Sequence, residues 1–298
     1  MSASYLEASA RERILALLDP GSFNELLPPA QRVVSPHLGQ LDAPVSFDDG
    51  VAVGEGRLGG RAVMAAAQEG GFMGGAVGEV HGAKLVGLLK RAIRQQAAGV
   101  VLLLETGGVR LHEANAGLIA VSEVMRAVLD ARAAGIPVIV LVGGANGCFG
   151  GMGIVARCAN AVIMSEEGRL AMSGPEVIET ANGVEEFDSR DRALVWRTTG
   201  GKHRYLIGDC QRLVEDDIAA FRQAAIEALE NAGPTALSLV ALEAEQEMLR
   251  RRMAAFGHAQ DPMDIWADLG VPRPESVPML EAAAFTAMAD GHRIQSKA

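Results

Sequence analysis

Twice in this chain, a short apolar segment leads into a glycine-rich loop that is followed by a helical pattern. The first unit has the apolar run "VVLLLE" (100–105), the loop Thr106-Gly107-Gly108 and a helical pattern over 114–135. The second has the run "VIVLV" (138–142), a loop that contains Gly150-Gly151, and another helical pattern. Buried strands that alternate with helices are typical of right-handed crossover connections. The sequence therefore predicts an α/β fold with a parallel sheet.

The chain divides into three segments within one expected structural domain. Residues 1–49 hold an N-terminal helix and a proline-marked irregular connector. Residues 50–210 form the core, in which two strands turn at Gly59-Gly60 and a short strand precedes a helix that begins at Pro175. Residues 211–298 form a helical C-terminal extension, which is expected to become irregular over 259–277.

The charge balance and the cysteine pattern exclude several classes of protein. There are 27 Lys and Arg residues against 37 Asp and Glu, a net charge of −10 that argues against nonspecific binding to nucleic acid or to an anionic membrane. The three cysteines form no Cys-x-x-Cys pair, so neither a disulfide framework nor a zinc ribbon is expected. The sequence lacks a signal pattern and an apolar run near the ~20 residues that span a bilayer. We therefore expect a cytoplasmic protein.

Two nucleotide-binding interpretations of the loop after Val142 fit poorly. A phosphate-binding P-loop needs a lysine after its last glycine, and none follows here. The segment 151–156 has the form of a dinucleotide fingerprint, but it begins nine residues after the strand rather than directly at its end. Glu166 also lies too close to be the ribose-binding acid of that motif.

A third interpretation makes the two glycine pairs donors of backbone N–H groups. A Gly-Gly at a strand-to-helix junction aims unpaired N–H groups at an anionic oxygen, with help from the helix dipole. Two such pairs at adjacent strand ends suit a reaction that passes through an enolate, whose charge lies on a thioester carbonyl oxygen. The alternative, that a glycine only permits a tight turn or close packing, stays open for each glycine taken alone.

Four motifs in a fixed order resemble those of the biotin-dependent acyl-CoA carboxyltransferases, which belong to the crotonase superfamily. They are "GGFMGGAVGEVHGAKL" (70–85), "ETGGVRLHEA" (105–114), "NGCFGGMGIVA" (146–156) and "GRLAMSGPEVIE" (168–179). The opening segment 10–26 also resembles the start of carboxyltransferase β subunits, and the similarity covers about residues 10–215. The resemblance implies a crotonase-like superhelix of ββα units of the acyl-CoA carboxyltransferase type.

Departures from that pattern narrow the resemblance. The zinc ribbon usual in bacterial acetyl-CoA carboxylase β subunits is missing, and the length allows one crotonase-like half where propionyl-type subunits have two. The segment "DPMDIWADLG" (261–270), with Thr106 and Val109 around the first glycine pair, is most similar to β subunits of biotin-independent malonate decarboxylases. In that family a γ subunit supplies the other half, and the substrate is a malonyl thioester on the CoA-like prosthetic group of an acyl carrier subunit. The complex also contains an acyl-transferase subunit.

The resemblance implies an enzyme subunit, active with its partner, and gives roles to particular residues. The N–H groups of Gly107, Gly108, Gly150 and Gly151 are implied to form the oxyanion hole that stabilises the enolate as CO2 leaves. The residues implied to contact the substrate are Gly74, Gly75, Thr106, Arg110, Gly147, Cys148 and Phe149. We expect no metal and no cofactor bound by this chain itself.

Some assignments keep an alternative. Arg110 either holds a substrate carboxylate or phosphate or forms a structural ion pair. His112 either donates a proton to the carbanion or is a solvated loop residue. Cys148 is expected to be a small buried apolar residue rather than a reactive thiol. For the whole chain, the alternatives are a carboxyltransferase half that moves CO2 from carboxybiotin to an acyl-CoA, and a noncatalytic partner whose glycine loops are structural.

Overall fold

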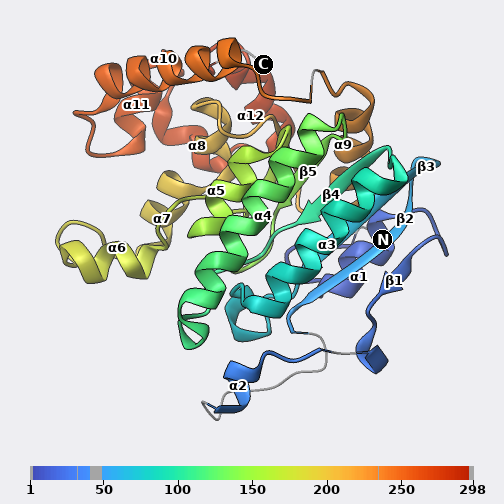
Figure 1. Ribbon diagram of the computed structural model, residues 1–298. Coiled ribbons are helices and arrows are strands. Elements are labelled where there is room, and N and C mark those ends of the chain that lie inside the picture. The colour runs from blue at the N-terminus through green and yellow to red at the C-terminus, as the bar shows by residue number, and fades with distance from the viewer. Residues whose placement is uncertain (1–2, 32, 41–48, 234, 295–298) are drawn as a thin grey trace.

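The computed structural model describes residues 3–31, 33–40, 49–233 and 235–294, and its centre is one seven-stranded sheet (Figure 1). The strands lie side by side in the order in which they occur along the chain. The first three pair antiparallel, and all later pairs are parallel. Their bounds are β1 Asn24–Leu26, β2 Val51–Leu58, β3 Arg61–Gln68, β4 Gly99–Leu103, β5 Val138–Val142, β6 Ala161–Ser165 and β7 Arg212–Val214.

The elements predicted around the two glycine loops are confirmed. β4 and β5 are buried along their whole length, as central parallel strands covered on both faces must be. The β2–β3 hairpin turns at Gly59 and Gly60, whose positive φ angles of +58° and +78° suit a two-residue hairpin turn. Glycine adopts these angles without steric cost, so the turn falls where the sequence places it.

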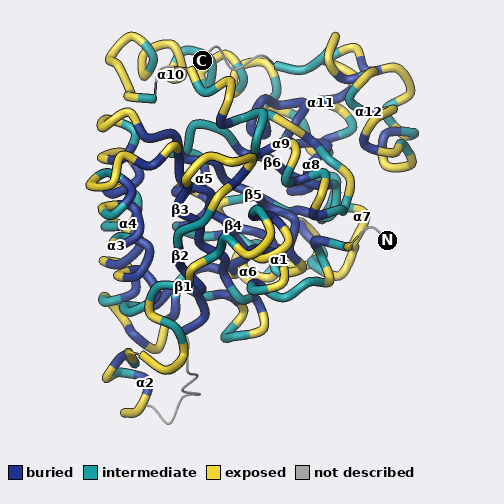
Figure 2. The backbone as a smooth tube through the Cα atoms, turned by 90° about the vertical axis from the view of Figure 1, so that its right-hand side faces the viewer, coloured by how far each residue is buried: buried dark blue, intermediate teal, exposed yellow. Residues whose placement is uncertain are grey.

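Helices cover both faces of the sheet (Figure 2). One face packs against α3 (Glu79–Gln95), α4 (Asn115–Ala133) and α5 (Gly151–Cys158), and the other against α1 (Ala10–Leu17) and α9 (Ile218–Glu230). Successive residues of one strand point to opposite faces. Val100 and Leu102 of β4 therefore enter the core under α3 and α4, while Val101 and Leu103 enter the core under α1 and α9.

Shorter elements and the C-terminal helices lie around this core. They are η1 (Pro29–Gln31), α2 (Pro36–Gln40), η2 (Met73–Gly75), η3 (Leu111–Glu113), α6 (Pro175–Asn182), α7 (Arg192–Thr199), α8 (Gly201–Leu206), α10 (Leu239–Phe256), α11 (Pro262–Asp268), η4 (Pro274–Met279) and α12 (Ala282–Ala289). Helices α10, α11 and α12 gather at one end of the molecule, at the top of Figure 1. β7 and α9 also follow residue 210, yet they belong to the sheet and to its helical layer. Among the described residues, no helix is long and apolar enough to cross a membrane.

The structure corrects two expectations about local structure. The segment 259–277 is not irregular, because it contains α11 and η4. Asp261 caps α11 reciprocally with Asp264, and Pro262 occupies the first turn, where its missing N–H costs nothing. The strand expected after Gly168 is also wrong, since Arg169 and Leu170 form only single bridges, to Gly200 and Cys148.

Candidate active site

The two glycine loops lie side by side beyond the ends of β4 and β5. We call residues 104–110 the first donor loop and residues 143–151 the second donor loop. A single parallel bridge joins Thr106 to Cys148. Thr106 N donates to Gly147 O over 2.7 Å, and Phe149 N donates to Thr106 O over 3.0 Å. The main chain of Thr106 therefore fixes the first donor loop against the second.

The two donor loops also approach each other closely at two glycines, Gly108 and Gly150. A Cβ built on Gly150 would lie 3.1 Å from Gly108 Cα, and Gly150 has φ +63°. Both the missing side chain and the positive φ are needed here, because an L side chain is strained at that angle and crowds the opposite main chain. The structure thus brings the predicted pairs, Gly107-Gly108 and Gly150-Gly151, to one place.

Three of the four predicted donor N–H groups already have acceptors in the chain. Gly107 N donates to Gly74 O over 2.9 Å, Gly108 N to Thr106 Oγ1 over 3.0 Å, and Gly150 N to Met172 O over 2.9 Å. Within the part of the chain that the structure describes, no acceptor is found for the N–H of Gly151. Since Gly151 is the first residue of α5, its N–H lies at the positive end of the helix dipole.

A third loop, which contains η2, packs against the first donor loop. Gly74 and Gly75, in η2, have φ values of +64° and +69°. A Cβ on Gly75 would lie 1.9 Å from the carbonyl oxygen of Glu105, so the two backbones touch. Their part in substrate contact stays a prediction, but Gly74 O accepts from Gly107 N and Gly75 permits the close approach to Glu105.

Arg110 is buried and donates within the chain from each of its guanidinium nitrogens. Its Nε donates to Ala76 O over 2.8 Å, its Nη2 donates to Asp49 O, and its Nη1 lies 3.2 Å from a Glu113 carboxylate oxygen. These contacts make Arg110 a clamp between the first donor loop and the segment before β2. Its role toward substrate stays a prediction, as does that of His112, which is exposed on η3.

Cys148 is completely buried in the second donor loop, and burial raises the pKa of its thiol well above the usual range. Burial likewise raises the pKa of the Cys210 thiol to about 12 and that of the half-buried Cys158 by less. The thiolate is the nucleophilic form of cysteine, so the chemistry of Cys148 is suppressed.

We predict that a maleimide at about pH 8 labels the native chain slowly at Cys158 and leaves Cys148 and Cys210 unlabelled, because only exposed thiols with accessible thiolate forms react. Mass spectrometry of peptides from the native and urea-unfolded protein measures this, with the unfolded protein as the control that labels at all three. Rapid native labelling of Cys148 would contradict the burial of this thiol.

Sequence reasoning missed a buried ion pair at the root of the first donor loop. Glu105 and Arg13 form this pair, with side chains only 6% and 3% exposed. The signal was present, because an acidic residue that ends an otherwise apolar strand pattern requires a charged partner once it is buried. The partner lies on α1, far away in the sequence, and only the fold identifies it.

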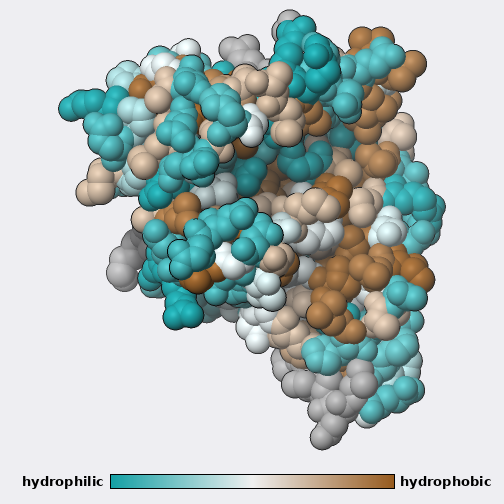
Figure 3. Space-filling model, turned by 90° about the vertical axis from the view of Figure 1, so that its left-hand side faces the viewer, coloured by the Kyte–Doolittle hydropathy of each residue, from teal (hydrophilic) through white to brown (hydrophobic). Residues whose placement is uncertain are grey.

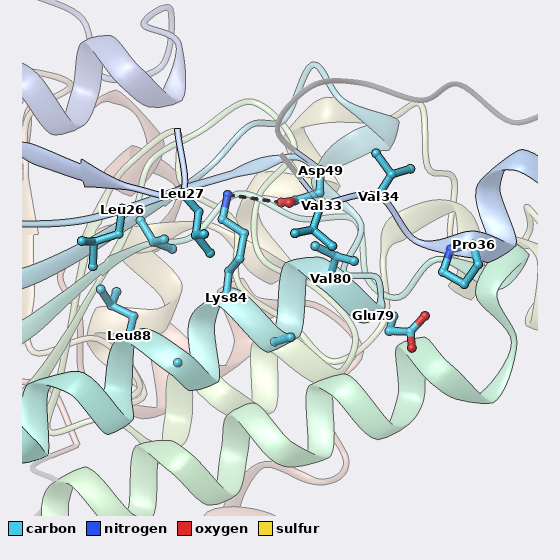
Figure 4. A pocket seen from close by; sticks show the side chains of 13 residues that line it. Leu26, Leu27, Val33, Val34, Pro36, Asp49, Glu79, Val80, Lys84 and Leu88 are labelled. Atoms are coloured by element: carbon cyan, nitrogen blue, oxygen red, sulfur yellow. Dashed lines mark ion pairs between the residues drawn. The ribbon is translucent and has the colours of Figure 1, made fainter. Parts of the chain in front are cut away.

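A separate cavity of about 460 Å³ lies between α3, β2 and the segment around α2 (Figure 4). Its lining is mainly apolar and includes Leu26, Leu27, Val33, Val34, Val53, Val80 and Leu88. Lys84 points into it from α3, with its Nζ 3.6 Å from an Asp49 carboxylate oxygen and 2.6 Å from Val51 O. The charge of Lys84 is thus compensated inside the chain.

Exposed apolar side chains surround the donor loops. They come from η3, α4, α5, the loop before α6 and α6 itself, and they are Leu111, Leu118, Ile119, Ile154, Met172 and Val177. Leu111 and Met172 are 87% and 71% exposed. Figure 3 shows apolar side chains gathered on the face of the molecule that is seen from the left of Figure 1. Exposed apolar surfaces of this kind occur where proteins contact other proteins, membranes or ligands.

Comparison with known proteins decides the family. A family model for the carboxyl transferase domain matches residues 7–227. The chain belongs to the carboxyl transferase family. The resemblance to carboxyltransferase β subunits inferred from the four motifs is thereby confirmed, and so is the crotonase-like fold of that family.

Particular members of the carboxyl transferase family are similar over nearly the whole chain. The malonyl-S-ACP:biotin-protein carboxyltransferase of Malonomonas rubra is 41% identical, and the match covers 96% of this chain and 95% of that protein. A chain of the Pseudomonas malonate decarboxylase hetero-tetramer, solved with malonate, is 40% identical with a TM-score of 0.81 and covers 88% of this chain and 95% of its own. The acetyl-coenzyme A carboxylase carboxyl transferase subunit beta of Fusobacterium nucleatum is 33% identical over 59% of each chain. The closer similarity to malonate decarboxylase subunits agrees with the sequence motifs.

Proposed function

We propose that this chain is the subunit of a malonate decarboxylase that decarboxylates a malonyl thioester carried on an acyl carrier subunit. The observation that carries the proposal is the N–H of Gly151, which has no acceptor among the described residues and belongs to the first residue of α5, next to Gly150, where the two donor loops meet. The similarity to malonate decarboxylase and to a carboxyltransferase that acts on malonyl-S-ACP supports the choice of substrate.

The proposed reaction uses the backbone N–H of Gly151 to stabilise charge. The thioester carbonyl oxygen accepts the Gly151 N–H, the bond between the α-carbon and the carboxylate breaks, and its electron pair moves onto the carbonyl oxygen as an enolate. CO2 leaves, and a proton added to the α-carbon gives the acetyl thioester. A single oxyanion donor is worth about 2.7–4 kcal/mol of transition-state stabilisation. No side-chain nucleophile is required, which fits the buried and protonated Cys148.

The proposal includes partner subunits. The apolar side chains around the donor loops fit a second crotonase-like subunit, the γ subunit, that closes the site against water. The thioester arrives on the CoA-like prosthetic group of the acyl carrier subunit, which an acyl-transferase subunit serves. This chain would hold the thioester end of that group and no cofactor of its own.

A second candidate function follows from the Malonomonas rubra relative. That protein is a malonyl-S-ACP:biotin-protein carboxyltransferase, so its reaction delivers the carboxyl group to a biotin protein. The same enolate forms in both reactions, because the same carbon–carbon bond breaks. The reactions differ in the fate of CO2, which is released in one and bonded to a biotin nitrogen in the other.

We predict that the complex co-purified with its partner subunits releases CO2 from the malonyl thioester of the carrier without any biotin protein, and that avidin has no effect. The two functions differ only in the CO2 acceptor, so release of labelled CO2 from malonyl thioester separates them. Turnover that begins only when a biotin carrier protein is added would establish the carboxyltransferase. A complex that cleaves no malonyl thioester under either condition would remove both candidates.

A further inference from the structure

We infer that Glu105 and Arg13 form a positioning pair that holds the second donor loop at its working distance from the first. The inference rests on the proposed function, since it assigns these residues to the placement of the Gly151 N–H. Neither side chain is proposed to touch the substrate. Their role is to connect three separate segments of the chain at the point where the donors must be aligned.

Glu105 joins the two donor loops with a single carboxylate. One oxygen accepts from the backbone N of Asn146 over 3.1 Å and from its Nδ2 over 3.3 Å. The other oxygen pairs with Arg13 Nη1. Asn146 Nδ2 also donates to Gly70 O over 3.0 Å, so the loop before η2 is tied to the same point.

The surroundings of Glu105 are shaped for a carboxylate. A Cβ on Gly144 would lie 2.3 Å from the Glu105 carboxylate, and a Cβ on Gly70 would lie 2.4 Å from one of its oxygens. Any side chain at either position would displace the carboxylate. Two glycines that the oxyanion hypothesis does not use are therefore explained by the space that Glu105 occupies.

Arg13 anchors this point to the opposite face of the sheet. Its Nε donates to Tyr5 O over 2.6 Å, its Nη2 donates to Leu6 O over 3.1 Å, and its guanidinium lies 4.7 Å from the centre of the Tyr5 ring. Tyr5 in turn packs on Phe221 of α9, with ring centroids 4.2 Å apart. The N-terminal segment is thereby connected to the donor loops through the buried ion pair of Arg13 and Glu105.

The position of the second donor loop matters because Gly151 follows Asn146 by five residues. Donors stabilise an enolate only when they lie within hydrogen-bonding distance of the oxygen as charge develops. A displacement of about 1 Å can cost about 100-fold in rate. Without Glu105, the Asn146 backbone N–H loses its acceptor. Among the described residues, the segment from Gly143 to Gly147 then keeps only the weaker ties of Asn146 Nδ2 to Gly70 O, of Arg169 Nη2 to Ala145 O and of Gly147 O to Thr106 N.

The test compares the assembled wild-type complex with three variants. Arg13→Met/Glu105→Leu removes both charges and keeps about the same side-chain volume. We choose the double variant because replacing a whole buried ion pair by apolar residues usually preserves stability, whereas leaving one charge buried and unpaired does not. Glu105→Gln keeps an amide oxygen for Asn146 N. Glu25→Gln is the matched control. Glu25, in β1, pairs with Arg11, which lies on the same helix α1 as Arg13, and this pair does not contact the donor loops.

Thermal unfolding, kcat and KM for the malonyl thioester, and amide hydrogen exchange of peptides spanning 143–151 are measured for each. We expect the double variant to unfold like the wild type, to lose about 100-fold in kcat with an unchanged KM, and to exchange faster over 143–151. Glu105→Gln should fall between the double variant and the wild type, and Glu25→Gln should match the wild type in all three measurements.

A folded double variant with wild-type kcat, or with unchanged exchange over 143–151, would overturn the inference. A purely structural role would lower the unfolding temperature and leave the kcat of the folded fraction intact, and that result also counts against it. Failure of the proposed function looks different, because the wild-type complex itself would then release no CO2. Hydrogen exchange reports the loop position even in that case.

Discussion

Replacing Gly151 by valine should reduce CO2 release by the complex to below about one-thousandth of the wild-type rate, while the complex still assembles. A Cβ at this position would lie 2.5 Å from Val121 Cγ1 of α4, and valine adds two further methyl groups. The start of α5 must then move away from α4, and the Gly151 N–H moves with it. The decisive measurement is single-turnover CO2 release with saturating malonyl thioester, which reports the chemical step alone.

A second, compensating substitution at Val121 tests whether the loss of activity comes from the contact between the added methyl group and Val121. Gly151→Ala alone brings one methyl into Val121 and should lose much of the activity. In Gly151→Ala/Val121→Ala, the contact with Cγ1 disappears and the nearest Val121 atom that remains is its Cβ, 3.5 Å away, an ordinary contact. We expect the double variant to recover most of the kcat. If Gly151→Val is as active as the wild type, the N–H of Gly151 is not the decisive donor.

Gly75→Ala should have the largest effect on stability. Alanine is strained at the φ of +69°, which costs roughly 1–2 kcal/mol by itself. Its Cβ would also lie 1.9 Å from Glu105 O. This oxygen belongs to the main chain, so it cannot move aside without displacing the first donor loop. We therefore expect unfolding in urea at a clearly lower concentration than in the wild type, together with a loss of kcat, because Gly74 O accepts from Gly107 N.

Gly60→Ala provides the matched control for Gly75→Ala. Gly60 has a similar φ of +78°, but nothing lies within 4 Å of the position that a Cβ would take. The urea midpoint of this variant should shift only by the cost of the left-handed conformation, and kcat should stay at the wild-type value. Equal midpoints for the two variants would show that the backbone contact of Gly75 is unimportant.

The sequence was sufficient for the frame of the molecule and for the places of the two glycine-rich loops, whose role as N–H donors stays a prediction. Apolar runs, glycine-rich loops and helical periods have local signals, so β4, β5 and the helices after them lie where they were expected. The sequence could not show which of Phe149, Gly150 and Gly151 has a backbone N–H without an acceptor. The answer depends on acceptors from other loops, Thr106 O and Met172 O, which occupy the first two N–H groups.

Two other misses have the same physical origin. The importance of Glu105 depends on Arg13, which lies on a helix behind the sheet and reaches it only in the folded chain. Helix α11 is seven residues long, too short to show a clear apolar period, although the Asp261 cap and Pro262 are visible in the sequence. Its Trp266 is buried and donates to His203 Nδ1 over 3.2 Å. Contact with the core, rather than local preference, stabilises this helix.

The single bridges beyond the strand ends place a limit on chain length in this region. Val77 pairs with Val109, Thr106 with Cys148, and Cys148 with Leu170, so each loop is aligned on the one before it. An insertion or deletion of one residue between a strand and its bridge would misalign every later loop. Evolution and protein engineering should therefore find length changes rejected within a few residues of the carboxyl ends of β4, β5 and β6.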